Sequence, residues 1–285
     1  MTYRELWQRL ATVYDEGEAK AIARMVYEVR YGLTMADLCM GKENTLPQAE
    51  LEAMTRRLEQ GEPVQYVLGE ATFCGRSFLV QPGVLIPRPE TQWLCHFISN
   101  NRQWLPQGAA ILDIGTGSGC IACTLALEHP HARLTAWDIS TQALAIAAEN
   151  ARRLHADVTF QQVDILNRQT LTGNGQGQKD KDALFDLIVS NPPYVTERER
   201  SQMARHVLEH EPSQALFVPD DDPLLFYRAI GLFARQSLTV GGHLLVEINQ
   251  QYGQDTARLL TAIGFHDVTV YRDMFDNDRF ISASQ

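Results

Sequence analysis

A short apolar run that ends abruptly at two prolines constrains this chain more than any other feature. Residues 185–189, Phe-Asp-Leu-Ile-Val, are typical of a buried strand, and Ser-Asn-Pro-Pro-Tyr follows at 190–194. Proline cannot donate the N–H that a central strand needs, and Pro192 disfavours helical backbone at Asn191, so the chain must leave the sheet there. The sequence therefore predicts a polar amide and an aromatic ring at a strand's carboxyl end, where open α/β sheets bind ligands. An ordinary Asn-Pro turn is the simpler interpretation.

The overall composition is that of a globular protein with room for one large domain or two modest ones, since 45% of the 285 residues are hydrophobic. A formal net charge of −10 argues against bare nucleic acid as the main partner, because nucleic-acid-binding proteins usually carry a basic surface. No apolar run is long enough to span a membrane, and the first residues lack the features of a secretory signal. Five cysteines, an odd number, suggest reduced thiols, with Cys120 and Cys123 packed in a helix. We therefore expect a cytoplasmic protein with no membrane partner and no direct contact with nucleic acid. We also expect a monomer, although none of these features determines the oligomeric state.

A second apolar run, at 109–115, leads straight into a glycine-rich loop and then into an apolar helix at 120–127. The loop consists of Gly115, Thr116, Gly117, Ser118 and Gly119. Glycine lets the backbone turn tightly and approach a ligand closely, and the N-terminus of the helix offers unpaired N–H groups. Such a loop suits a nucleotide-type cofactor, but NAD and S-adenosylmethionine fit the pattern equally well.

Acidic residues end the next two predicted strands. Asp138 ends the strand at 133–138, nineteen residues after Gly119, where a carboxylate can accept both hydroxyl groups of a ribose. Asp164 follows the strand at 158–163 and suits the amino group of an adenine. Either carboxylate could instead cap the next helix. Together with the glycine loop, the acids predict a nucleoside-bearing cofactor without choosing between the candidates.

The chain before the glycine loop divides into a helical part and a linker. In residues 1–62, apolar residues recur at helical spacing, which predicts a small helical bundle as a separate N-terminal domain. Val64, Tyr66 and Leu68 then alternate before a turn at 74–75, which predicts a β-hairpin within a linker over 63–88. Residues 89–285 would form the ligand-binding domain.

Arg88 lies between Pro87 and Pro89 in a segment that both prolines stiffen. A guanidinium fixed in this way can bind a carboxylate through two hydrogen bonds, although a solvated linker charge is the simpler interpretation.

The rest of the chain predicts further helices and strands but no metal site. Helices are expected at 141–154, 197–209, 223–237 and 253–263, strands at 242–249 and around 268–270 and 280–281, and a long polar loop at 167–183. His206 and His210 lie one helical turn apart. No cysteine or other histidine is near them in sequence, so we expect no metal there.

The order of these motifs resembles that of class I S-adenosylmethionine-dependent methyltransferases. Over nearly its whole length, the chain is similar to the HemK/PrmC family of protein-(glutamine-N5) methyltransferases. The segments that carry the resemblance are 61–66, 85–91, 113–119, 190–194, 211–212, 241–242 and 278–279. The proline-arginine-proline segment combined with Asn-Pro-Pro-Tyr is its most specific part. Gln92, Ile165 and Asn249 depart from the family's usual residues, as does the long loop at 167–183.

The resemblance implies a fold, a reaction and a substrate. The fold would be α/β, with a Rossmann-like sheet of seven strands, the last of them antiparallel, and an N-terminal helical domain that helps hold the substrate. The enzyme would methylate the glutamine of the Gly-Gly-Gln motif in peptide chain release factors. The cofactor would be S-adenosyl-L-methionine and its product S-adenosyl-L-homocysteine.

The same resemblance assigns roles to individual residues. The catalytic residues would be Asn191, Pro192 and Tyr194. The release factor would contact these three residues together with Pro193 and Arg88. The cofactor would contact Asp113, Gly115, Thr116, Gly117, Ser118, Gly119, Asp138, Ile139, Asp164, Ile165 and Asn191.

The expected chemistry depends on holding a weak nucleophile in place. An amide nitrogen reacts poorly because its lone pair is delocalised into the carbonyl. If the side-chain oxygen of Asn191 and the backbone carbonyl of Pro192 each accept one N–H, the nitrogen faces the methyl donor, and Tyr194 can stack on the amide.

Three other functions remain open at this point. An adenine-N6 DNA methyltransferase would share residues 190–194 but would need a basic surface. An NAD-dependent oxidoreductase would leave those residues unexplained. A non-catalytic module could bind a release factor without modifying it.

Overall fold

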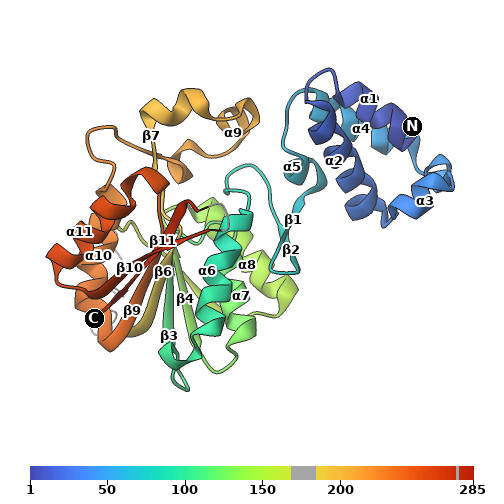
Figure 1. Cartoon of the computed structure of the whole chain (residues 1–285). Helices are drawn as coiled ribbons and strands as arrows, with labels where there is room; N and C mark the ends of the chain where they lie inside the picture. Colours follow the sequence, from blue (N-terminus) through green and yellow to red (C-terminus); the bar gives the residue numbers. More distant parts are fainter. Residues whose placement is uncertain (168–183, 274–275) are drawn as a thin grey trace. The chain divides into compact units, whose positions relative to one another are not determined.

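The computed structural model describes residues 1–167, 184–273 and 276–285, and the chain forms two compact units (Figure 1). We call the first, Met1–Ala71 with Val80–Pro82 and Met203–Glu211, the helical unit. The second, Thr72–Leu79 with Gly83–Gln202 and Pro212–Gln285, is the sheet unit. The polar loop expected at 167–183 lies outside the described residues, apart from Asn167.

The helical unit consists of short helices, and those of residues 1–68 pack around a core of their own. Its helices are α1 (Tyr3–Leu10), α2 (Glu16–Met25), α3 (Met35–Cys39), α4 (Gln48–Glu59), α5 (Val64–Leu68) and α9 (Arg205–His210). Fully buried side chains in its core include Leu6, Leu10, Tyr27, Leu51 and Leu58, and α9 contributes no buried residue to it. The helical periodicity of residues 1–62 therefore reflects burial of one face of each helix.

The strand expected at 64–68 is wrong, because this stretch forms the helix α5. Val64 and Val67, about one helical turn apart, both pack into the core of the helical unit. Gly69, whose φ is 78°, ends the helix in the left-handed region. Apolar residues do alternate at 64, 66 and 68, but the burial of Val64 and Val67 on one helical face favours the helix.

The predicted hairpin is present but shorter than the alternation suggests. It consists of β1 (Glu70–Phe73) and β2 (Arg76–Leu79), which form a two-stranded sheet. Cys74 and Gly75 between them have φ of 47° and 71°, and a tight hairpin turn needs such positive values at both central residues.

The single helix predicted at 197–209 is also wrong. The structure has a 3-10 helix, Glu197–Gln202, and then α9, with extended backbone at Ala204 between them. Neither piece contains a buried residue. No apolar face is therefore available to stabilise a longer helix.

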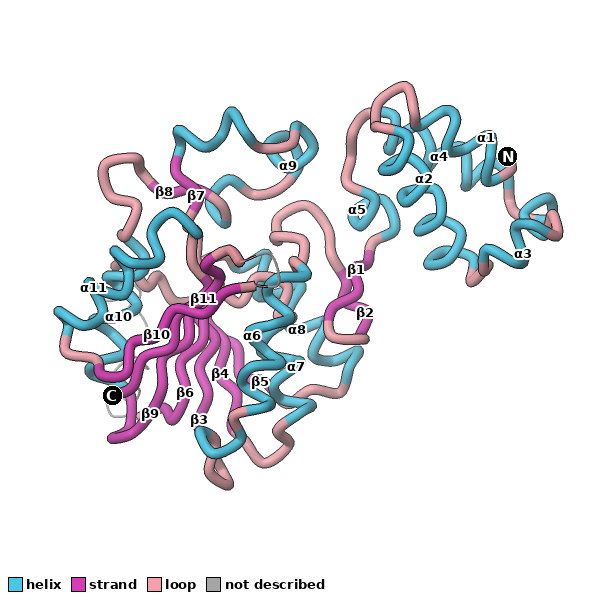
Figure 2. The backbone as a smooth tube through the Cα atoms, viewed as in Figure 1, coloured by secondary structure: helices cyan, strands magenta, loops and turns pink. Residues whose placement is uncertain are grey.

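A seven-stranded sheet forms the centre of the sheet unit (Figure 2). Its order is β10-β11-β9-β6-β3-β4-β5. The strands are β3 (Ala110–Ile114), β4 (Arg133–Asp138), β5 (Val158–Gln162), β6 (Phe185–Ser190), β9 (Leu238–Glu247), β10 (His266–Arg272) and β11 (Asp278–Ser284). β11 pairs antiparallel with β9 and β10, whereas the pairs from β9 to β5 are parallel. The expected sheet with its last strand antiparallel is therefore confirmed.

Helices cover both faces of this sheet (Figure 1). They are α6 (Pro89–Asn100), α7 (Cys120–Glu128), α8 (Thr141–Leu154), α10 (Leu225–Ser237) and α11 (Gly253–Ile263), and the short strands β7 (Val195–Thr196) and β8 (Phe217–Val218) pair separately. Side chains alternate along β3, so Ile111 packs with α6, α7 and α8 while Leu112 and Ile114 pack with α10 and α11. Among the described residues, no helix combines the length and the hydrophobicity that a membrane crossing needs.

The carboxyl ends of the parallel strands meet at one edge of the sheet. Ile114, the last residue of β3, pairs with Trp137 of β4 on one side and with Ser190 of β6 on the other. Ser190 in turn pairs with Val246 of β9. The strand order reverses between β3 and β6, which is the switch point where open sheets bind ligands. The glycine loop and residues 190–194 therefore begin beside each other at this point.

Candidate active site

A cavity of about 350 Å³ lies at this edge of the sheet unit, within the size range of ligand sites. It takes residues from the loops that follow β3, β4, β5 and β6. The predicted site residues that line it are Gly115, Gly117, Asp138, Ile139, Asp164, Ile165, Asn191, Pro192 and Pro193. The topology thus brings together most of the residues that the sequence singled out.

The remaining predicted residues do not line the cavity. Asp113, Thr116 and Ser118 are buried within the glycine-loop structure, and Gly119 is the N-cap of α7. Arg88 is the N-cap of α6, and Tyr194 packs at the margin of the sheet core. Residues that the sequence did not identify, among them Gly83, Leu85, Phe226 and Ile230, complete the cavity wall. Leu85 begins the segment 85–91 that carries part of the resemblance, whereas the other three lie outside the segments that carry it.

The glycine loop is tight because α7 and α8 approach each other closely. Gly119 has a φ of 79°, and a Cβ atom built there would lie 3.0 Å from the Cβ of Ala147 in α8. A larger residue would therefore be strained by its backbone conformation and also crowded by α8. This close packing sets the position of the helix N-terminus behind the loop.

Asp138 connects the glycine loop to the next turn. One of its carboxylate oxygens accepts a hydrogen bond from the Gly117 N–H at 2.9 Å, and the other accepts one from the Ser140 N–H at 2.9 Å. Burial raises the pKa of this carboxyl, while these hydrogen bonds lower it. Each oxygen has a second lone pair, so the carboxylate can still accept two hydroxyl groups.

The rest of the cavity suits an adenosine-type cofactor. Ile139 and Ile165 provide apolar surface, and the carboxylate of Asp164 accepts the Leu166 N–H at 2.9 Å. The carboxylate of Asp138 can accept from ribose hydroxyls and that of Asp164 from an amino group, in a cavity with an apolar wall. The residues present therefore fit the cofactor that the sequence predicts.

Asp113, below the loop, is a fully buried acid with an incomplete set of partners. The Thr116 hydroxyl donates to one carboxylate oxygen at 2.7 Å, and the other oxygen has no hydrogen-bond partner within the described part of the chain. Burial raises the pKa of the Asp113 carboxyl to about 7. An aspartate ordinarily has a pKa of about 3.9.

This raised pKa predicts a stability that depends on pH. Between about pH 4 and pH 7 the folded chain keeps a proton on Asp113 that the unfolded chain has released, so the contribution of this group to the free energy of unfolding falls as pH rises. Asp113→Asn cannot ionise and should show a smaller fall than the wild type. Urea unfolding of both proteins at about pH 5 and about pH 8 measures the difference. An equal fall in both would contradict the raised pKa.

Asn191 begins a chain of side-chain hydrogen bonds that the sequence analysis missed. Its amide nitrogen lies 3.0 Å from the Thr91 hydroxyl oxygen, which in turn lies 2.7 Å from a carboxylate oxygen of Glu247. The Tyr194 hydroxyl donates to the other oxygen of Glu247 at 3.0 Å. Glu247 is buried at the end of β9, with 2% of its surface exposed. A single acid within the apolar run 244–248 is the sequence signal that could have identified it.

Asn249, one of the departures from the family pattern, supports the same segment. Its side-chain N–H groups donate to the backbone carbonyl of Tyr194 at 3.1 Å and to the Glu199 carboxylate. Its φ of −68° is open to any residue, so glycine is not required by the backbone here. Asn249 thus holds the end of the Asn-Pro-Pro-Tyr segment.

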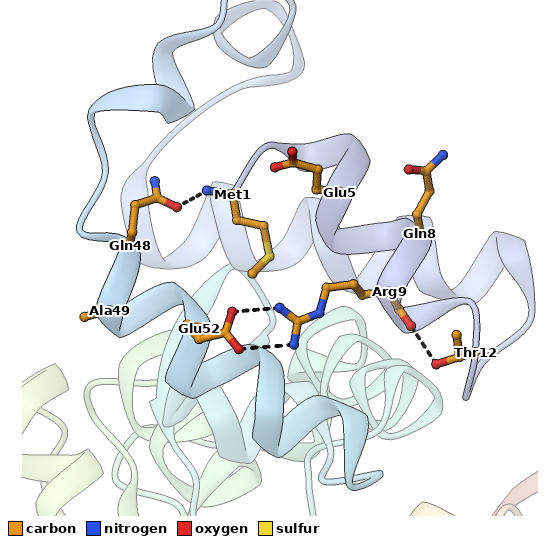
Figure 3. A pocket seen from close by; sticks show the side chains of 8 residues that line it. All are labelled: Met1, Glu5, Gln8, Arg9, Thr12, Gln48, Ala49 and Glu52. Carbon is orange, nitrogen blue, oxygen red and sulfur yellow. Dashed lines mark hydrogen bonds and ion pairs between the residues drawn. The ribbon is translucent and has the colours of Figure 1, made fainter.

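A second hollow, of about 840 Å³, lies in the helical unit (Figure 3). Arg9 in its wall is paired with Glu52 at 2.7 Å and with Glu59 at 2.9 Å. Met1 and Gln48 form a further hydrogen bond across it. Its charged Arg9 and Glu52 are paired with each other, so this hollow gives no indication of chemistry.

Comparison with known proteins identifies relatives over both parts of the chain. Residues 3–69 match the PrmC N-terminal domain family, and residues 90–217 match the Methyltransferase small domain family. The chain is 45% identical over 281 residues to a release factor glutamine methyltransferase of Bacteroides thetaiotaomicron, covering 98% of this chain and 97% of that protein. It is 39% identical over 282 residues to the Flavobacterium psychrophilum protein of the same name, covering 97% and 95%.

Solved structures show the fold. A methyltransferase from Pyrococcus furiosus has a TM-score of 0.51 at 15% identity, covering 83% of this chain and 96% of that one. A 16S rRNA N2 G1207 methyltransferase from T. thermophilus, in complex with AdoMet and guanosine, has a TM-score of 0.52 at 17% identity, covering 76% and 49%. The expected class I S-adenosylmethionine-dependent methyltransferase fold is confirmed. Because relatives this similar align over almost the full length, the chain belongs to the release factor glutamine methyltransferase family.

Proposed function

We propose that this enzyme transfers a methyl group from S-adenosyl-L-methionine to the side-chain amide nitrogen of the glutamine in the Gly-Gly-Gln motif of peptide chain release factors. The other product is S-adenosyl-L-homocysteine. The observation that carries the proposal is the position of Asn191 and Pro192, at the switch point and in the wall of a cavity suited to adenosine. The two relatives reported above, both named release factor glutamine methyltransferases, support the choice of substrate.

Two acceptors in this segment would hold the substrate amide. The Asn191 side-chain oxygen and the Pro192 backbone carbonyl each accept one of the two N–H groups, which fixes the nitrogen with its lone-pair face toward the cavity. The bound cofactor supplies an electrophilic methyl group. Both acceptors also favour the positive charge that develops on the nitrogen in the transition state. The methylated nitrogen is positively charged and releases one proton to solvent after the methyl group has arrived, so no strong base is required.

Tyr194 and Arg88 would act around this centre. The bond from the Tyr194 hydroxyl to Glu247 fixes the orientation of the ring, which we expect to stack on the flat amide and exclude water. Arg88 directly precedes α6 and would contact the release factor through its guanidinium. Residues 1–62 would help hold the release factor, residues 63–88 would link them to the catalytic part, and residues 89–285 would carry catalysis.

Mass spectrometry of a release factor incubated with the enzyme and S-adenosyl-L-methionine tests the proposal. We expect an added methyl group on the glutamine of Gly-Gly-Gln, and no modification of a release factor whose Gly-Gly-Gln glutamine is replaced by asparagine. Methylation of adenine in a DNA control, with the release factor unmodified, would instead indicate a nucleic-acid substrate. Tight binding to the release factor without methylation would indicate a non-catalytic binding module.

A further inference from the structure

We propose that Thr91 and Glu247 are positioning residues that decide which way the side-chain amide of Asn191 faces. In this arrangement the amide nitrogen of Asn191 is turned toward Thr91, and its oxygen is presented to the substrate amide. The inference rests on the proposed function, because it explains how the acceptor in that reaction is kept in the accepting orientation.

The three side chains come from different parts of the sheet unit. Asn191 follows β6, Glu247 ends the neighbouring strand β9, and Thr91 lies in the first turn of α6. Because Ser190 pairs with Val246, the residues that follow them are brought to the same edge of the sheet. Thr91 and Glu247 are both 2% exposed, so solvent does not compete for these bonds.

The number of available protons fixes the direction of each hydrogen bond. An ionised carboxylate can only accept, so the single hydroxyl proton of Thr91 is donated to Glu247 at 2.7 Å. The Thr91 oxygen can then only accept in its contact with Asn191. At 3.0 Å, the Asn191 group that faces it must be the N–H donor, which leaves the amide oxygen on the other side.

The opposite orientation of the amide would be unfavourable and unproductive. It would place the Asn191 oxygen against a Thr91 oxygen whose only proton is already used, leaving two acceptors in contact at a partly buried position. It would also present N–H donors to the N–H groups of the substrate. The carboxylate of Glu247 therefore determines, through the hydroxyl of Thr91, which side of the Asn191 amide faces the substrate.

Several groups around Glu247 affect its ionisation. Burial raises its pKa, and the nearby charge of Glu90 adds to this effect. The hydrogen bonds from Thr91 and Tyr194 lower the pKa, as does the positive charge of Arg279. The net effect leaves the pKa of Glu247 above its ordinary value, and in its ionised form the carboxylate accepts from both Thr91 and Tyr194.

Substitutions of Thr91 distinguish the effect of its hydroxyl on the orientation of Asn191 from the effect of its size on packing. Thr91→Val keeps the shape but removes the hydroxyl, and we expect kcat to fall about 10²-fold because the acceptor is no longer held in place. The dissociation constant for S-adenosyl-L-methionine should stay unchanged. Thr91→Ser retains the hydroxyl and should recover most of the activity. Should the valine variant fold poorly, Thr91→Ala replaces it in the same comparison.

Thr256→Val is the matched control. Thr256 is also fully buried in a helix, but its hydroxyl has no hydrogen-bond partner among the residues that the structure describes. This variant should leave kcat unchanged while reporting what the loss of a buried threonine does to the melting temperature. A Thr91→Val enzyme as active as Thr256→Val, or a Thr91→Ser enzyme as impaired as Thr91→Val, would overturn the proposal.

A spectroscopic measurement tests the orientation without turnover. In a ¹⁵N-labelled enzyme, the side-chain amide signal of Asn191 is the one absent from Asn191→Ala. We expect one of its protons to be shifted downfield by the bond to Thr91 in the wild type and in Thr91→Ser, and this shift to disappear in Thr91→Val. If the wild type fails to methylate a release factor but shows this pattern, the proposed function fails and the positioning role stands. If the wild type methylates and the signal does not respond to Thr91→Val, the positioning role fails alone.

Discussion

Asn191→Ala should lower kcat by about 10²–10⁴-fold, the range seen when a group that acts on the transition state is removed. The alanine side chain cannot accept an N–H, so the substrate nitrogen loses one of the two contacts that hold it and one of the acceptors that favour its developing charge. Asn191 is also among the residues expected to contact the cofactor, but most of the cofactor affinity should be preserved, because the acid and the apolar wall that suit the nucleoside are untouched. Steady-state kinetics on a release factor, together with titration of S-adenosyl-L-methionine, measure both effects.

Asn101→Ala provides a matched control for this loss of an amide. The Asn101 side chain donates to Phe97 within the same helix end and accepts from Gln103, and it is not part of the cavity wall. We expect the kcat of Asn101→Ala to equal that of the wild type. The assignment of Asn191 is wrong if Asn191→Ala keeps near-normal turnover, or if its melting temperature falls far enough to explain the loss.

The second large effect is expected at Asp138, on cofactor affinity rather than turnover. Two charge-assisted hydrogen bonds to ribose hydroxyls, at about 1.5–3 kcal/mol each, would be lost in Asp138→Ala. At about 1.4 kcal/mol for each tenfold change, the dissociation constant for S-adenosyl-L-methionine should rise about 10²–10⁴-fold. Calorimetric titration of the cofactor measures this change directly.

Asp138→Ala also removes a structural contact, because the carboxylate accepts the Gly117 and Ser140 N–H groups. Asp186→Ala is the control for this effect. Asp186, near the start of β6, accepts the Ala110 N–H at 2.8 Å and the Thr239 hydroxyl at 3.2 Å, away from the cavity. Both variants should lose some thermal stability, but only Asp138→Ala should lose affinity for S-adenosyl-L-methionine. If the two variants bind S-adenosyl-L-methionine equally well, Asp138 makes no ribose contact.

The parts of the site that could be predicted are those that the chain specifies locally. A proline must end a central strand, and a run of glycines between a strand and a helix must form a tight loop, whatever the rest of the molecule does. The position of Asn191 at a strand end and the positive φ of Gly115, Gly117 and Gly119 follow from these constraints. Asp138 and Asp164 could be identified because parallel strands present their carboxyl ends at one edge.

Two local predictions failed where packing decides between alternatives. The alternating residues at 64–68 fit a strand, but Val64 and Val67 are buried on one helical face. The polar segment at 197–209 has enough helix-forming residues for a long helix, but no buried face to hold one together. In both cases the deciding quantity is contact with residues that are distant in sequence.

The sequence by itself determined the fold class and placed the glycine loop, the two acids and Asn191 at strand ends, because strand ends, glycine turns and prolines act on the chain where they occur. Only the tertiary structure decided which side chains hold the amide of Asn191. Thr91, Asn191 and Glu247 are distant in sequence, and no spacing rule relates them. They meet because β6 and β9 are parallel neighbours and the first turn of α6 lies over their ends. A hydrogen bond has a direction that depends on both of its partners, so the direction of the bond between Asn191 and Thr91 depends on Glu247, which only the tertiary structure brings beside them.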